Sequence, residues 1–154
     1  MPYAVVNVPA APVRKKAMHQ SEMINQLLFG EAAEILEAKG KRWWLIRSLH
    51  DGYKGWIANN LIEEVTAEQS KAKPDYVTVG LINTIKISKE SMNIPLGSSL
   101  PYYLNGRGHI GNSEYTFGNT QFFPRQFTGI ARSFHSLVMS GGITWYVFEF
   151  LWKW

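Results

Sequence analysis

Cysteine is absent from the entire sequence of 154 residues. A chain without thiols has no disulfide framework, no cysteine-ligated metal site and no thiol nucleophile. The four histidines also lack the short spacing to one another, or to a carboxylate partner, that a metal site requires; they are His19, His50, His109 and His135. The sequence therefore predicts no catalytic residue, no metal ligand and no cofactor.

Long apolar runs are missing as well. No stretch approaches the roughly 18 apolar residues that a membrane-spanning helix needs, so we expect no membrane span. The first residues, MPYAVVNVPAAPV, carry neither a basic leader nor a long apolar segment followed by a cleavage site. This pattern predicts a cytoplasmic protein, or a periplasmic or cell-wall-associated one if a leader has been removed.

The excess of positive charge is small and dispersed. The net charge is +4, and the only basic run is Arg14-Lys15-Lys16. Binding to nucleic acid normally gathers many cations on one face, so we expect no nucleic-acid partner. A weak attraction to acidic cell-wall polymers remains compatible with this charge.

Short alternating runs separated by glycine turns occupy the first part of the chain. We expect strands at Tyr3–Val8, in the apolar run that closes at Phe29-Gly30, and at residues 31–37, 43–47 and 53–57. The turns Lys39-Gly40-Lys41 and His50-Asp51-Gly52 supply the positive φ that hairpins need. Strands at this spacing predict a small, strongly bent antiparallel barrel.

A polar segment then separates two parts of different composition. The stretch TAEQSKAKPD, residues 66–75, reads as a linker with one helical turn at Ala67–Lys71, and the chain after it is poorer in charge and richer in aromatic residues. Further strands are expected at residues 76–79, 81–87 and 115–117. Asn105-Gly106 indicates a hairpin turn rather than a phosphate loop, because no Lys-Ser/Thr pair follows it.

The order of several short motifs resembles the bacterial SH3 domain, and more narrowly the first such domain of NlpC/P60 cell-wall cysteine peptidases. These motifs are Pro12-Val13-Arg14, the run SEMxxQLLFGE beginning at Ser21, Trp43 or Trp44 before Ile46-Arg47, and Gly55-Trp56-Ile57. The later motif LGSSLP with a glycine turn and a Y-x-F strand resembles the second SH3-like domain of these peptidases. The resemblance covers about residues 3–118.

This resemblance implies an all-β fold of two small SH3-like barrels joined by a polar linker. The first bacterial SH3 domain would span residues 1–66, the linker 67–75 and the second SH3-like domain 76–126. Residues 127–154 would be a degenerate strand or helix extension that resembles the start of the catalytic domain. Its apolar end, ITWYVFEFLWKW, could also support a homo-oligomer.

The resemblance implies that the catalytic domain of the family would be missing or degenerate in this sequence. If Ser140-Gly141-Gly142 is aligned with the family's Trp-Gly-Gly, then Phe150 falls where the nucleophilic cysteine should be. Phenylalanine has no lone pair to offer, and His109 and His135 come too early to act as the family's base. The sequence therefore argues against an autonomous enzyme.

Four residues are candidate ligand contacts. In the resembled family the first SH3 domain helps recognise the free amine of an N-terminal L-Ala, and Glu22 would supply charge-assisted hydrogen bonds to it; the alternative is a surface carboxylate. His19 lies on the loop beside the expected groove, or is simply exposed. Of the adjacent Trp43 and Trp44, one should face the core and the other outward as a platform for a peptide or sugar. Trp56, by contrast, is expected in the core.

Three functions remain open. The first is a non-catalytic SH3 module that binds murein peptide, L-Ala-γ-D-Glu-diamino acid, or a partner protein. The second is the non-catalytic portion of an active γ-D-glutamyl-diamino-acid endopeptidase whose catalytic domain is on another chain. The third is a structural or oligomerising remnant.

Overall fold

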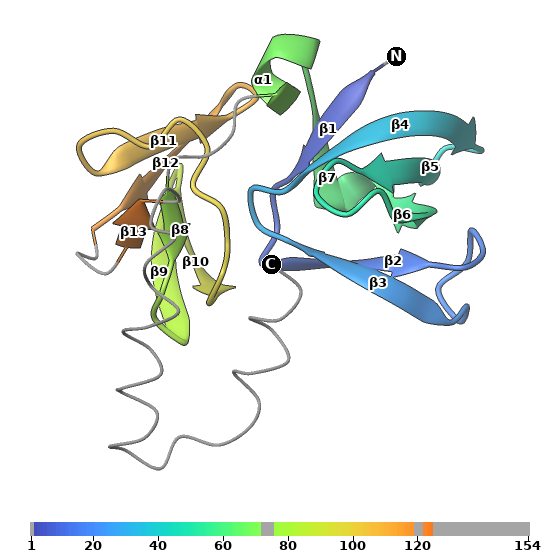
Figure 1. Cartoon of the computed structure of the whole chain (residues 1–154), viewed down its shortest axis with the longest axis horizontal. Helices are drawn as coiled ribbons and strands as arrows, with labels where there is room; N and C mark the ends of the chain where they lie inside the picture. Colours follow the sequence, from blue (N-terminus) through green and yellow to red (C-terminus); the bar gives the residue numbers. More distant parts are fainter. Residues whose placement is uncertain (1, 72–75, 119–121, 125–154) are drawn as a thin grey trace.

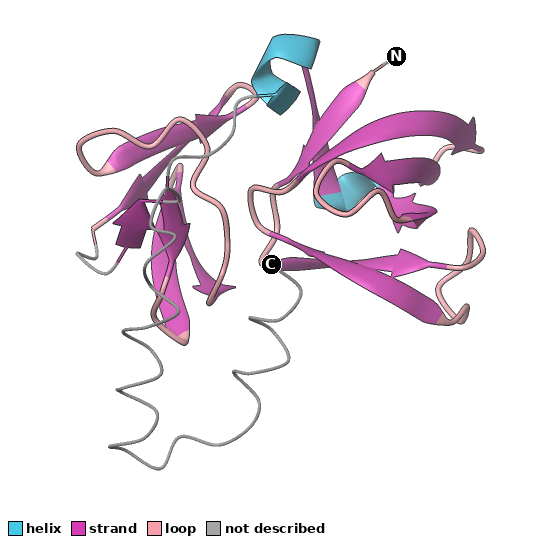
Figure 2. Ribbon diagram, viewed as in Figure 1, coloured by secondary structure: helices cyan, strands magenta, loops and turns pink. Residues whose placement is uncertain are grey.

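The computed structural model describes residues 2–71, 76–118 and 122–124. The expected extension at 127–154 and the last residues of the expected linker lie outside this part of the chain. Strands make up most of what is described, as Figure 2 shows. The all-β prediction is confirmed.

A seven-stranded antiparallel sheet forms the first half of the molecule, in the order β3-β2-β6-β5-β4-β1-β7 (Figure 1). Its strands are β1 (Tyr3–Val6), β2 (Ala10–Arg14), β3 (Met23–Leu28), β4 (Ala32–Lys39), β5 (Trp43–Ser48), β6 (Lys54–Ala58) and β7 (Ile62–Val65), with a 3-10 turn, η1 (Asn59–Leu61), before β7. The hairpin glycines behave as the sequence predicts, since Gly40 and Gly52 both have positive φ.

Strand β2 was not among the predicted strands, because it contains Pro12 and the sequence around it indicates a turn. In the structure Pro12 lies opposite Gln26 of β3, and β2 meets its other neighbour, β6, only where Arg14 faces Trp56. Proline lacks the N–H that a fully paired strand needs. It is tolerated here because little of β2 pairs on that second side.

A short helix, α1 (Ala67–Lys71), follows the first sheet at the position where the sequence predicts one helical turn. Its start is a reciprocal capping arrangement: the Gln69 N–H donates to the Thr66 hydroxyl oxygen at 3.1 Å, and the Thr66 N–H donates to Gln69 Oε1 at 3.0 Å. This pairing satisfies backbone donors that a helix leaves open. Helix α1 lies against β1 and β4.

The second half contains a four-stranded sheet, in the order β10-β9-β12-β11, and the pair β13-β8. The strands are β8 (Tyr76–Thr78), β9 (Ile82–Ile87), β10 (Glu90–Pro95), β11 (Arg107–Ile110), β12 (Ser113–Phe117) and β13 (Phe122–Pro124). Asn105 and Gly106 both have positive φ, and the backbones of Leu104 and Arg107 exchange two hydrogen bonds across them. The predicted hairpin turn is therefore confirmed.

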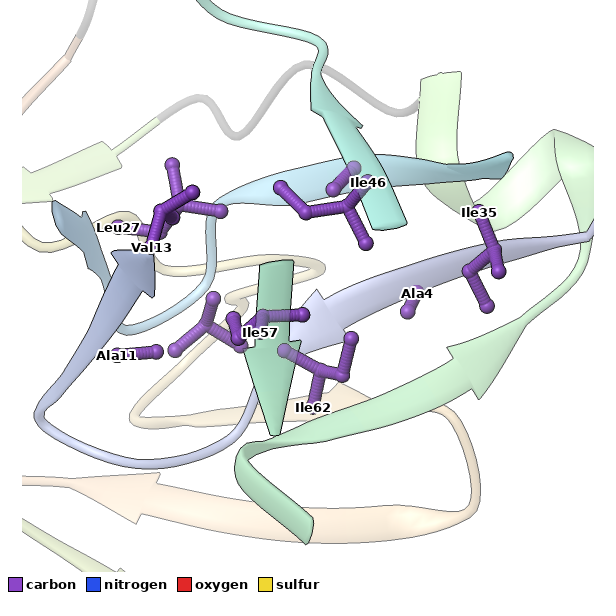
Figure 3. Packing of buried hydrophobic residues seen from close by; sticks show 10 residues of the cluster. Ala4, Ala11, Val13, Leu27, Ile35, Ile46, Ile57 and Ile62 are labelled. Atoms are coloured by element: carbon purple, nitrogen blue, oxygen red, sulfur yellow. The ribbon is translucent and has the colours of Figure 1, made fainter. Parts of the chain in front are cut away.

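Two apolar clusters hold these sheets. The first fills the interior of the seven-stranded sheet, and Figure 3 shows the side chains that converge there from β1 to β7. It consists of Ala4, Val6, Ala11, Val13, Leu27, Ala33, Ile35, Ile46, Ile57 and Ile62. Alternate positions along each strand supply these residues, as expected for a sheet with one buried face.

The second cluster draws on both halves of the chain. Val5 and Phe29 of the first half pack with six residues of the second: Ile85, Ile94, Leu100, Ile110, Tyr115 and Phe117. Phe29 is completely buried, and its ring meets that of Tyr115 edge to face at 5.6 Å. The Phe29 side chain thus belongs to the core of the second half, although its backbone follows β3.

Hydrogen bonds also join the halves. The Ser99 N–H donates to the Phe29 carbonyl at 3.0 Å, and the Asn112 N–H donates to Glu63 Oε1 at 3.0 Å. A side chain at Gly30, where φ is +80°, would meet the Ser99 carbonyl. The division into domains at residues 66 and 76 stays a prediction, and the two parts share buried surface across it.

Candidate functional site

The loop between β2 and β3 carries two of the candidate contact residues. Its base is closed by the Lys15 N–H, which donates to the Glu22 carbonyl at 3.0 Å, and by the Arg14 guanidinium, which donates to the Ser21 carbonyl at 2.8 Å. The Lys16 N–H further donates to the Ser21 hydroxyl at 2.9 Å. These bonds give the loop a defined shape and present residues 17–20 at its tip.

His19 at this tip meets Trp43 at the start of β5. Their ring centroids lie 4.9 Å apart, and the ring planes are inclined by 59°. His19 is exposed and Trp43 is half-buried, so the pair keeps open aromatic surface. The structure therefore brings together two candidate residues that stand 24 positions apart in the sequence.

Trp43 and Trp44 lie on opposite faces of β5, as adjacent strand residues must. Trp44 packs against the first core, beside Ile57 of the neighbouring strand β6. Trp43, with the opposite parity, belongs to the outer face. Of the two tryptophans, Trp43 is thus the one available to a ligand.

Glu22 is an exposed carboxylate at the base of the loop. Its Oε2 lies 3.4 Å from Lys15 Nζ, and both side chains are about two-thirds exposed, at 66% and 65%. A pair this open contributes little to stability, of the order of 0–1 kcal/mol. Glu22 can therefore exchange Lys15 for another cation at small cost.

Trp56 is not in the core, contrary to the expectation from Gly55-Trp56-Ile57. Gly55 and Ile57 occupy the inner face of β6, where a side chain at Gly55 would collide with Val13. Trp56 must then point outward, and the Lys39 ammonium lies 5.6 Å from its ring centroid. This distance is within reach of a cation–π contact.

The outer face of β4, β5 and β6 thus carries two residues, Leu45 and Trp56, that the sequence analysis did not place there. Leu45 lies opposite Trp56 and shares this face with Trp43. The alternation of Ile46 and Ile57, taken as core positions, could have placed Leu45 and Trp56 outside. What the sequence did not supply was the register that aligns these strands.

Asp51, in the turn between β5 and β6, is held as an anion. Burial acts to raise its pKa, but the Tyr53 N–H, the Ser48 hydroxyl and the Asn25 amide outweigh burial, and the pKa falls below 3.8. The Asn25 amide donates to Asp51 Oδ2 at 3.0 Å and links β3 to this turn. The Asp51 carboxylate therefore has a structural role, since its hydrogen bonds hold the β5–β6 turn against β3.

Burial raises the pKa of the Tyr115 hydroxyl far above its ordinary value, with a smaller contribution from Tyr103. The hydroxyl donates to the Pro101 carbonyl at 2.7 Å. Tyr115 is therefore a neutral core residue.

Within the described ranges, no cluster of three His, Asp or Glu side chains is arranged to hold a metal ion. No helix in those ranges is long and apolar enough to cross a membrane. His19 and Trp43 contribute aromatic surface beside the β2–β3 loop, and Glu22 contributes an exposed carboxylate at the base of that loop. The structure brings His19 and Trp43 into contact, whereas the described contacts of Glu22 are with Lys15.

Comparison with known families identifies part of this sheet. Residues 13–62 match the family model of the bacterial dipeptidyl-peptidase Sh3 domain. The match begins within β2, ends at the start of β7, and includes His19, Glu22, Trp43 and Trp44. No curated protein matches the chain. Residues 13–62 are therefore similar to a bacterial SH3 domain, which is a non-catalytic module.

Proposed function

We propose that this chain is a non-catalytic bacterial SH3 module that binds murein peptide, L-Ala-γ-D-Glu-diamino acid, on the outer face of its first sheet. The observation that carries the proposal is the contact between His19 and Trp43, because it joins the β2–β3 loop to an outward aromatic residue of β5. The matched family also supports a role in peptide recognition, since its description places such domains in bacterial dipeptidyl-peptidases.

The ammonium group and the apolar atoms of this peptide match the groups that Glu22, Trp43 and His19 offer. Glu22 accepts hydrogen bonds from the free ammonium of L-Ala, and such charge-assisted bonds are stronger than neutral ones. The rings of Trp43 and His19 pack on the apolar atoms of the peptide and remove them from water. Because Glu22 is loosely paired with Lys15, binding replaces one exposed cation with another.

An NMR titration of the 15N-labelled protein with L-Ala-γ-D-Glu-diaminopimelate tests this function. We expect saturable shifts in the 15N spectrum at residues 18–22 and at the Trp43 indole, while the peptide signals in the same tube remain those of the intact peptide. Absence of shifts at millimolar peptide contradicts binding. Cleavage of the peptide contradicts the non-catalytic assignment.

A matched ligand isolates the role of the ammonium. The N-acetylated tripeptide has the same apolar atoms and no positive end, so it should bind more weakly to the wild-type protein. Trp44→Leu serves as the matched control variant, because Trp44 lies on the inner face; once shown to be folded, it should bind the peptide as the wild type does.

A further inference from the structure

An open depression of about 490 Å³ lies on the second half of the molecule, on the β11–β12 hairpin. This volume is in the range of small-ligand sites. Side chains line it from the segment before β11, from both strands of the hairpin and from the turn that joins them: Tyr102, Leu104, Arg107, His109, Asn112 and Glu114. The seven-stranded sheet with His19 and Trp43 takes no part in this lining.

Strand parity places the polar lining residues on one face. Gly108 and Ile110 of β11 are buried, so Arg107 and His109 point to the outer face. Glu114 of β12 lies directly opposite His109 in the sheet register. The hairpin therefore offers a cation, an anion and an imidazole side by side.

Tyr102 covers this face with its ring. The ring stacks on the His109 imidazole with centroids 4.2 Å apart and planes only 15° from parallel. Tyr102 as a whole is 40% exposed, which leaves part of its surface available to a ligand. By contrast the neighbouring Tyr103 belongs to the second core.

The backbone at Tyr102 is unusual for an aromatic residue, since its φ is +51°. A non-glycine residue in this region costs of the order of 1 kcal/mol or more. Such strain is often found where a side chain is held for recognition.

The two charges next to this ring nearly neutralise each other. Arg107 Nη1 lies 3.5 Å from Glu114 Oε1, and their side chains are 74% and 61% exposed. Arginine only donates hydrogen bonds and an ionised glutamate only accepts them. A hydroxyl group does both, so a ligand with adjacent hydroxyls can bridge the pair without separating the charges.

We propose that this depression is a carbohydrate-binding site that takes a pyranose ring. The apolar face of the sugar stacks on the exposed surface of Tyr102, and its hydroxyl groups accept from Arg107 and donate to Glu114. An anionic ligand is disfavoured by Glu114 and a cationic one by Arg107, whereas a neutral sugar meets neither repulsion. The sugar can belong to a free oligosaccharide or to a polymer.

Titration with three trisaccharides tests the site: maltotriose, cellotriose and tri-N-acetylchitotriose, each followed by NMR of the 15N-labelled protein. We expect at least one to give saturable shifts grouped at Tyr102, His109 and Glu114. A parallel sedimentation assay with amylose, cellulose and chitin separates a preference for the polymer from binding of the free sugar. If no trisaccharide shifts these residues and no polymer retains the protein, the proposal is wrong.

Variants at position 102 show whether the ring is the platform. Tyr102→Asn removes the ring and keeps a residue that tolerates positive φ, and it should weaken binding by at least about tenfold, which corresponds to ~1.4 kcal/mol. Tyr102→Phe should bind nearly as the wild type does, because stacking needs no hydroxyl. Tyr53→Asn, which removes an exposed tyrosine of the first half, is the matched control. Binding that survives Tyr102→Asn in a folded protein overturns the proposal.

Discussion

At the scale of single residues, the adjacent Trp43 and Trp44 have opposite environments, since Trp44 packs on the first core and Trp43 meets His19. Trp44→Leu removes buried aromatic surface and should lower the free energy of unfolding by about 1–3 kcal/mol. Trp43→Leu should cost less stability and should weaken tripeptide binding instead. Urea unfolding and peptide titration of both variants measure the two effects, and equal losses in both assays contradict this separation.

Asp51 gives the molecule a predictable response to acid. Its pKa is lower in the folded protein than its ordinary value of 3.8, so its contribution to stability is complete above that pH and is lost as pH falls through the folded pKa. Asp51→Asn should remove this contribution, which is below about 1 kcal/mol because the turn is exposed. The wild type and the variant should differ in urea unfolding at pH 6, and the difference should shrink as the pH falls below 3.8.

Single-residue chemistry was only partly readable from the sequence. The parity of Trp43 and Trp44 followed from their adjacency, and the loop position of His19 followed from the resemblance to the bacterial SH3 domain. The lysine beside Glu22 and the outward position of Trp56 depend on which strands become neighbours. The stack of Tyr102 on His109 depends on the positive φ of Tyr102, which no sequence spacing predicts.

At the scale of elements, glycine turns and alternating runs predicted most strands of the first sheet. Strand β10 was missed because its sequence, ESMNIP, is largely polar. It is held as a strand by its antiparallel pairing with β9, which its composition does not reveal. Helix α1 was predicted from a polar stretch, and the capping pair of Thr66 and Gln69 explains why so short a segment is helical.

The turn at Phe29-Gly30 leaves no room for an added methyl group. Gly30→Ala combines an unfavourable φ with a collision against the Ser99 carbonyl. The Ser99 carbonyl belongs to the backbone, so it cannot move aside as easily as a side chain. We expect a loss of about 2–4 kcal/mol in the free energy of unfolding. Gly40→Ala also has positive φ but meets no atom within 4 Å, so urea unfolding should show a smaller loss for it, and similar losses would refute the role of the Ser99 contact.

At the scale of the whole molecule, the second core extends across the expected domain boundary. Phe29 supplies a fully buried ring to that core, so Phe29→Ala should destabilise the protein by about 3–5 kcal/mol. Because Phe29 contacts Tyr115, the second sheet should lose structure in the same transition as the first. Residue-specific NMR during thermal unfolding tests this coupling.

Met23→Ala is the control for this substitution. Met23 lies on β3, the strand that precedes Phe29, and is 55% exposed, so its truncation should change the free energy of unfolding by less than about 0.5 kcal/mol. If Phe29→Ala leaves the melting of the second sheet unchanged, the two halves do not share a core in solution. The sequence alone did not indicate this sharing, because the Phe29-Gly30 motif lies entirely within the first half.

The proposed recognition of a free peptide amine is tested most directly by calorimetric affinities in a four-way comparison. L-Ala-γ-D-Glu-diaminopimelate and its N-acetylated form are each measured against the wild type and Glu22→Gln. We predict that acetylation weakens binding to the wild type by about two- to tenfold and has a much smaller effect on Glu22→Gln. Equal effects of acetylation on both proteins, or no binding of the free peptide to the wild type, would contradict the account.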